Sequence, residues 1–141
     1  CAIHFAVPLF EDSPYHGLRR VIDISGDGPN NNGLPVTIAR DAALEKGIII
    51  NGLPIMVKEP AYSSMDIADL DIYYEDCVIG GPGSFVLTIK DREKFREAIR
   101  TKLCMEVAGR MPERRVIPVA EKEPRVSCMI GEKIWNDRWG R

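Results

Sequence analysis

The sequence has no hydrophobic run long enough to cross a membrane and no excess of positive charge. Its apolar runs are broken by Gly, Pro or charged residues well before the roughly 20 residues that a spanning helix requires. Its 19 basic residues are outnumbered by 21 acidic ones, whereas nucleic acid or an anionic membrane surface would need a concentrated basic face. We therefore expect a chain with no membrane span and no nucleic acid partner.

Cysteine and histidine are too few and too scattered to form a familiar metal or catalytic site. The cysteines contain no C-x-x-C pair, so the spacing of a zinc or thioredoxin-type site is missing. An even count permits disulfides without requiring them, and buried free thiols are the simpler interpretation. Two histidines have no recognisable nucleophile as partner, and Ser25 does not lie in a G-x-S-x-G elbow, so neither a catalytic triad nor a hydrolase elbow is supported. These residues are Cys1, Cys77, Cys104, Cys128, His4 and His16.

The chain does contain an alternation of strand and helix patterns. The β-branched run RRVIDISG (19–26) ends at a glycine, and PVTIARDAALEKG (35–47) has helical spacing between a proline and a glycine. A second β-branched run, IIINGLPIMV (48–57), follows at once. Strand, helix and strand in this order and length predict a βαβ unit with parallel strands.

The same patterns predict further elements on both sides of this unit. A helix is expected over residues 2–12, a short helix or irregular connector over 63–77, a strand over 84–89 and a helix over 91–109. In the first helix the expected buried face is Ala2, Phe5, Ala6, Leu9 and Phe10. In the last helix it is Phe95, Ala98, Ile99, Leu103 and Val107.

Alternating strands and helices predict an α/β fold with a doubly wound, mostly parallel sheet in a three-layer arrangement. Few strands are recognisable, so the chain reads as a domain that lacks its N-terminal strands. Residues 1–109 are expected to form this partial domain. Residues 110–141 lose periodicity and carry several prolines and charges, which predicts an extended or partly disordered tail.

The stretch VIDISGDGPNNNG (21–33) is the best candidate for a site. In open α/β sheets ligands bind beyond the carboxyl ends of the strands, where Asp27 and the asparagines 30–32 are expected to lie. Oxygen ligands of this kind suit Mg²⁺ or Ca²⁺. Asp, Gly, Pro and Asn also form tight turns for backbone reasons alone, so a simple turn remains the alternative.

Two other features of this stretch need an explanation. Gly26-x-Gly28 precedes a helix, which leaves a nucleotide or phosphate site as a rival, although the fingerprint is incomplete and Asp27 would repel a phosphate. Asp23 lies inside the strand and must be paired or hydrogen-bonded there. Its candidate partners are Arg19, Arg20 and Arg40. The second glycine-rich stretch, CVIGGPGSF (77–85), precedes a strand and predicts a turn.

RRVIDISGDGPNNNGLPVTIARDAALEKGIIINGLPIM (19–56), followed by YYEDCVIGGPGSFV (73–86), closely resembles the bacterial family of uncharacterised proteins DUF1194, a branch of the von Willebrand factor type A (VWA) fold. The resemblance covers roughly Ala2 to Ala108. It makes 21–28 the fourth strand of that fold, which ends in a Thr-Asp-Gly whose aspartate helps to form the metal-ion-dependent adhesion site (MIDAS). Asp27-Gly28 matches this Asp-Gly, whereas Gly26 stands where Thr or Ser is usual.

The resemblance implies a divalent-cation-dependent module, not an enzyme, that binds an acidic group of a protein partner. Asp27 would hold Mg²⁺ or another divalent cation, with Ser25 and Asn30 in support. The other two metal-site loops would lie before Cys1, so no tight binding by this chain alone is expected. A degenerate, purely structural site is the alternative. Structural roles fall to Asp23, Gly26, Gly28, Gly80 and Gly81.

The resemblance and the missing strands carry two further expectations. Members of the family are exported, which implies a periplasmic or secreted protein. A sheet edge left open would also allow self-association.

Overall fold

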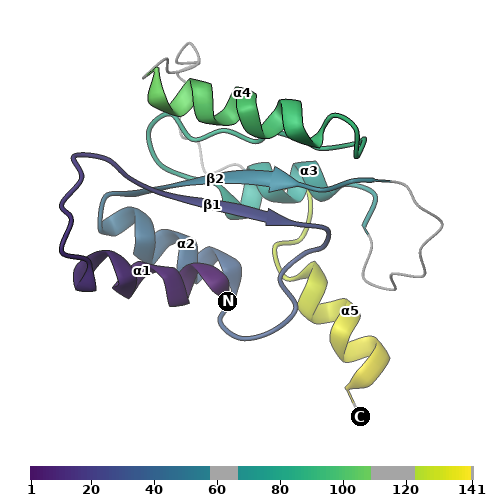
Figure 1. The fold of residues 1–141 in the computed structure, drawn as a ribbon. Coiled ribbons are helices and arrows are strands. Elements are labelled where there is room, and N and C mark those ends of the chain that lie inside the picture. The colour runs from purple at the N-terminus through teal and green to yellow at the C-terminus, as the bar shows by residue number, and fades with distance from the viewer. Residues whose placement is uncertain (58–66, 109–122, 141) are drawn as a thin grey trace.

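The computed structural model describes residues 1–57, 67–108 and 123–140. These residues form a mixed α/β structure with a two-stranded parallel sheet and helices (Figure 1). No helix among them is both long and apolar enough to cross a membrane. The elements in chain order are α1 (Ala2–Asp12), β1 (Arg20–Gly26), α2 (Val36–Glu45), β2 (Ile48–Pro54), α3 (Leu70–Tyr73), the π-helix η1 (Tyr74–Val78), α4 (Phe95–Val107) and α5 (Ile130–Trp139).

The predicted strand, helix, strand unit is present as β1, α2 and β2. The two strands pair in parallel, with Arg20 opposite Ile48 and Gly26 opposite Pro54. Helix α2 connects them and ends before Gly47, whose positive φ of 70° terminates the helix in the way that glycine commonly does. This part of the chain was therefore predicted correctly.

The predicted strand 84–89 lies along the other edge of β2 but is interrupted. Gly52 donates its N–H to the Phe85 carbonyl at 3.0 Å and accepts from the Leu87 N–H at 2.9 Å, and the Pro54 carbonyl accepts from Ile89 at 2.9 Å. In a regular parallel ladder residue 54 would also donate to Leu87, but proline has no N–H. Only isolated parallel bridges therefore form, Gly52 with Val86 and Ile55 with Ile89.

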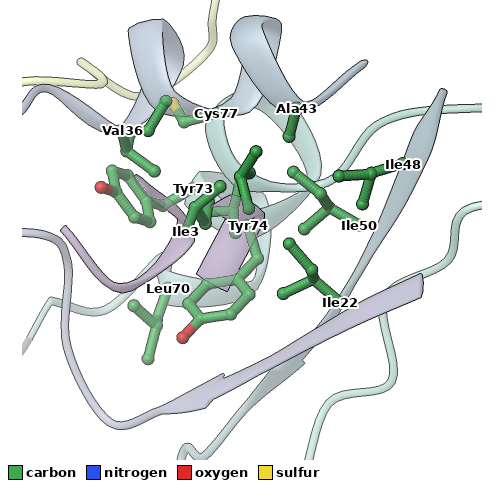
Figure 2. Close-up of a cluster of buried hydrophobic side chains, with 13 residues drawn as sticks. Ile3, Ile22, Val36, Ala43, Ile48, Ile50, Leu70, Tyr73, Tyr74 and Cys77 are labelled. Carbon is green, nitrogen blue, oxygen red and sulfur yellow. The ribbon is translucent and has the colours of Figure 1, made fainter. Parts of the chain in front are cut away.

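Helices lie on both sides of the strands. Figure 1 shows α4 on one side of β1 and β2, and α1 and α2 on the other. The main core fills the second side, where Ile22, Ile48 and Ile50 meet Ala43 of α2 and Tyr74 of η1 (Figure 2). Burying side chains of this size stabilises the fold by roughly 1.5 to 3 kcal/mol each.

Tyr74 approaches the backbone of both strands. A Cβ atom built on Gly52 of β2 would lie 2.5 Å from Cδ1 of the Tyr74 ring, and one built on Gly26 of β1 would lie 2.9 Å from the Tyr74 hydroxyl. The ring therefore occupies space that a side chain on either strand would need.

The buried face predicted for the first helix was wrong in part. Ile3 and Val7 of α1 are buried, whereas Phe5 and Leu9 are 74% and 54% exposed. Both pairs have i, i+4 spacing on a helix that is apolar almost all round, so the pattern did not single out one stripe.

The predicted stripe of α4 is also largely exposed. Phe95 and Leu103 are about half exposed, Val107 is 88% exposed, and Lys102 is the buried residue of this helix. The helix itself was predicted correctly, but it faces the sheet through a charged side chain.

The described part of the predicted tail contains a helix that the sequence did not indicate. Residues 123–140 include α5, and a disulfide joins Cys77 to Cys128. Cys1 and Cys104 are free. Residues 109–122 and 141 lie outside the described residues, as do 63–66 of the predicted connector, of which the remaining part forms α3 and η1.

Candidate functional site

Asp27 lies at the carboxyl end of β1, as the strand pattern predicted. Strand β1 ends at Gly26, and both Ser25 and Asp27 are exposed. Parallel strands bring their carboxyl ends to one edge of the sheet, so this is the edge at which ligands bind in open α/β sheets. The Asp27 carboxylate is therefore accessible to a ligand from solvent. The alternative, a simple turn, is equally consistent with this backbone path.

The Tyr74 hydroxyl lies next to this loop. Burial, the neighbouring Tyr73 and the charge of Asp27 together raise the pKa of Tyr74 to about 12. The phenol therefore keeps its proton at neutral pH and is a neutral donor near the Asp27 carboxylate.

Asn30 is partly buried and committed to structural contacts. Its side-chain nitrogen donates to the Leu34 carbonyl at 3.3 Å and to Oε1 of Glu132 at 2.6 Å, and its backbone N–H donates to the Tyr73 hydroxyl at 3.1 Å. The side-chain oxygen of Asn30 is therefore the atom of this side chain that remains available to bind a ligand.

The pKa of the Tyr73 hydroxyl, which accepts a hydrogen bond from the Asn30 N–H, is also raised. Burial, opposed in part by the Asn30 N–H and assisted by the charge of Glu132, raises the pKa of Tyr73 to about 12. Burial thus keeps both tyrosines of this edge neutral.

Asp23 is paired, as predicted, but with a residue that the sequence did not suggest. Lys102 of α4 donates to Asp23 Oδ2 and lies 3.3 Å from Glu106 Oε2. The predicted partners Arg20 and Arg40 bind elsewhere, Arg20 to the Lys46 carbonyl and Arg40 to Asp41 and the Asp76 carbonyl.

Asn51 completes this cluster inside the sheet. It stands opposite Asp23 in the β1–β2 register, is fully buried, and donates to Asp23 Oδ1 at 3.4 Å and to Glu106 Oε1 at 3.1 Å. Its oxygen accepts from the Phe85 N–H at 3.2 Å. The cluster of Asp23, Asn51, Lys102 and Glu106 ties α4 to the sheet, which fits the structural role expected for Asp23.

The glycines of the second loop behave as turn residues. Gly81 has a φ of 94°, where other residues are strained, and a Cβ on Gly80 would lie 2.7 Å from Leu44 Cδ1. At the first loop, α2 begins only at Val36, so Gly26 and Gly28 do not open the helix directly as a phosphate-binding turn would.

Carboxylates are sparse at this edge. Over the ranges 1–57, 67–108 and 123–140, no group of three or more His, Cys, Asp or Glu side chains is arranged to hold a metal ion. Asp27 supplies an exposed carboxylate that a hard cation can use, and the rest of a coordination shell would have to come from Ser25 or Asn30, from water or from other loops.

Sequence reasoning missed the contacts made by Tyr73, Tyr74 and Glu132. The two tyrosines follow an acidic stretch without clear periodicity, and Glu132 is 102 positions from Asn30 in a region that was predicted as tail. No local pattern signals a contact of that separation.

Comparison with known proteins identifies a family. Neither a curated protein nor a solved structure matches the chain. A family model described as "Protein of unknown function (DUF1194)" matches residues 1–111, which is most of the chain. The chain therefore belongs to the DUF1194 family.

Proposed function

We propose that this chain is part of a VWA-like domain whose carboxyl-edge loop contributes to a divalent cation site, and that the domain binds an acidic group of a protein partner through that cation. The observation that carries the proposal is the position of Asp27. Its exposed carboxylate directly follows a parallel strand at the edge where α/β folds bind ligands.

The arrangement of elements supports the doubly wound fold. The strands run in the order β1, β2 and then segment 84–89, all parallel, with α4 on one side and α1 and α2 on the other (Figure 1). Parallel sheets occur almost only where helices cover both faces.

The chemistry of the loop supports a weakly held hard cation. Mg²⁺ usually keeps several waters and uses only one or two carboxylates, so Asp27 is sufficient as the contribution of this loop. Ser25 is exposed beside it and offers a hydroxyl, whereas Gly26 offers none. An open coordination position would then take the carboxylate of the partner, a binding role that involves no catalysis.

The disulfide supports an exported, periplasmic location. Disulfides form and persist in oxidising compartments and are rare in reducing ones. The Cys77–Cys128 disulfide, which encloses a sequence separation of 51, suits such a compartment.

The cation site is tested by thermal unfolding of the full-length protein with and without Mg²⁺ or Mn²⁺. A cation at about 100 times its Kd stabilises the folded state by about 2.7 kcal/mol, which raises the melting temperature measurably. Asp27→Ala should remove this increase. Asp12→Ala, at the exposed end of α1, is the matched control and should retain it.

Two outcomes would count against the proposal. A wild-type melting temperature that does not respond to either cation would contradict cation binding. Saturable nucleotide binding that survives Asp27→Ala would instead favour a phosphate site at Gly26 and Gly28.

A further inference from the structure

The C-terminal residues 123–140, here named the C-terminal cover, fold back onto the loop of the proposed cation site. The cover is attached at two neighbouring places, at η1 through Arg125 and Cys128 and at Asn30 through the first turn of α5. Figure 1 shows α5 leaving the body of the molecule near the loop between β1 and α2. The family match ends at residue 111, so the cover lies outside it.

A disulfide and an arginine attach the cover to η1. Cys77 of η1 is fully buried and bonded to Cys128 of the cover. Nearby, Arg125 donates from Nη2 to Glu75 Oε2 and Asp76 Oδ1, both at 2.7 Å, and from Nε and its backbone N–H to Asp76 Oδ2. The Arg125 side chain is 53% exposed, so its ion pairs are screened and hold the cover less firmly than the covalent bond.

The first turn of α5 rests on Asn30 and Pro29. Gly131, in the first turn of α5, is buried so closely that a Cβ atom there would clash with the Asn30 carbonyl oxygen and lie 3.1 Å from Pro29 Cγ. Glu132 accepts from the Asn30 side chain at 2.6 Å. The first turn of α5 therefore covers the loop that carries Asn30.

The contact between α5 and Asn30 is supported by the Cys77–Cys128 disulfide. Oε2 of Glu132 is buried without a hydrogen-bond partner among the described residues, which is unfavourable. Beyond the first turn, Trp135 and Trp139 are 44% and 64% exposed, so the rest of α5 adds little contact. Val126 and Ile130 of the cover also pack against the core, and the covalent link keeps all of these contacts at a high local concentration.

We infer that the Cys77–Cys128 disulfide holds the C-terminal cover over the loop at Asn30, and that its reduction by a dithiol releases the cover and opens this edge. Cys128 is only partly buried, so a dithiol thiolate attacks its sulfur and the S–S bond breaks. Cys77 leaves as a thiolate and takes up a proton. The second thiol of the reductant then displaces Cys128, and its proton passes to the Cys128 thiolate. Two electrons thus reduce the disulfide to two thiols while the dithiol becomes a cyclic disulfide.

Release would change the environment of the proposed cation site. The Asn30 side chain loses Glu132 and becomes free to turn toward the loop, and the loop loses the backbone of Gly131 above it. This consequence for cation binding rests on the proposed function, whereas the release itself does not.

Hydrogen exchange measured by mass spectrometry on the full-length protein tests the release. Cys128→Ser should speed exchange in peptides that cover 29–34 and α5 by about tenfold or more, because local opening becomes easier. At labelling times too short for exchange through global unfolding, peptides from β2 should stay protected in both proteins. Cys104→Ser, which removes an exposed free thiol of α4, is the matched control and should behave as wild type.

Gly131→Ala provides a second variant that leaves the disulfide intact. The added methyl group has no room against Asn30, so faster exchange at 29–34 is expected there too, with β2 again unchanged. Unchanged exchange at 29–34 in both variants, or equal acceleration in β2, would overturn the inference.

A Mn²⁺ titration of the wild type and Cys128→Ser separates this inference from the proposed function. A change in Mn²⁺ affinity together with faster exchange supports both. Faster exchange with no Mn²⁺ binding in either protein supports the release of the cover and contradicts the proposed cation site. Mn²⁺ binding of equal affinity in both proteins shows that the cover does not regulate the site.

Discussion

At the scale of single residues, the sequence predicted that Asp23 needs a partner but not which one. The prediction assumed a buried carboxylate, whereas Asp23 is exposed on β1 and the buried residue of the pair is Lys102. The partner Lys102 lies 79 positions away on a helix whose apolar stripe drew attention to other residues. Only the packing of α4 over the sheet brings the two together, and no local pattern encodes that.

Replacing Lys102 tests the cluster. Burial acts to lower the pKa of Lys102, but Asp23 and Glu106 outweigh it and leave this pKa above its ordinary value of 10.5. Lys102→Met should lower the free energy of unfolding by about 1 to 2 kcal/mol near neutral pH, because two carboxylates lose their cation. Urea unfolding measures this loss, with the exposed Lys90→Met as control.

The pH dependence of that loss follows from the raised pKa. A lysine whose pKa is higher in the folded state stabilises it fully below the ordinary value of 10.5 and loses this effect as pH rises through the folded value. The difference between wild type and Lys102→Met should therefore shrink in strongly alkaline solution. A difference that stays constant would mean that packing of the lysine stem, and not its charge, stabilises α4.

Tyr73 and Tyr74 should ionise only in strongly alkaline solution. The pKa of each is about 12 in the folded protein, against 10.0 ordinarily. Between these values the unfolded chain loses protons that the folded chain keeps, so the free energy of unfolding falls as pH rises. Phenolate absorbance should show an ionisation step near pH 12. Tyr73→Phe or Tyr74→Phe should each reduce the size of this step. Complete ionisation by about pH 11 would contradict the buried positions of the two rings.

At the scale of elements, helix positions were predicted better than helix orientation. Proline and glycine mark the ends of α2 directly in the sequence, and β-branched runs mark β1 and β2. The faces of α1 and α4 were harder, because both helices carry apolar residues on exposed sides. Which side is buried depends on the neighbouring elements.

Two leucine substitutions compare the stability contributed by a buried helix position and by an exposed one. Leu70 is 1% exposed and Leu103 is 49% exposed, although the sequence predicted Leu103 as part of a buried stripe. Leu70→Ala should cost about 3 kcal/mol of unfolding free energy, and Leu103→Ala less than about 1 kcal/mol. Equal losses in urea unfolding would show that the outer face of α4 is covered in solution.

At the scale of the whole molecule, the sequence predicted the α/β class and the parallel strand pair. It did not predict that Pro54 would interrupt the ladder to segment 84–89, nor that residues 123–140 would return to the core. The interruption at Pro54 depends on the register of the strands. The return of residues 123–140 depends on a cysteine pairing that the spacing alone leaves open. At the candidate site it placed Asp27 correctly, whereas the contacts of Asn30 come from remote segments.

The disulfide should stabilise the molecule as a whole. Its sequence separation of 51 restricts the unfolded chain, an effect worth about 4 kcal/mol. Cys128→Ser should lower the free energy of unfolding by about this amount in urea without reductant, and Cys104→Ser should leave it within about 0.5 kcal/mol. A wild-type protein whose stability does not change on adding a dithiol would contradict a formed disulfide.

The position of the Tyr74 ring has a consequence for the evolution of this family. The ring fills the space above Gly52 and its hydroxyl fills the space above Gly26, so a side chain at either glycine must displace it. A relative with alanine or a larger residue at position 52 should therefore carry a smaller residue in place of Tyr74. These three positions, on two strands and one helix, should change together or not at all.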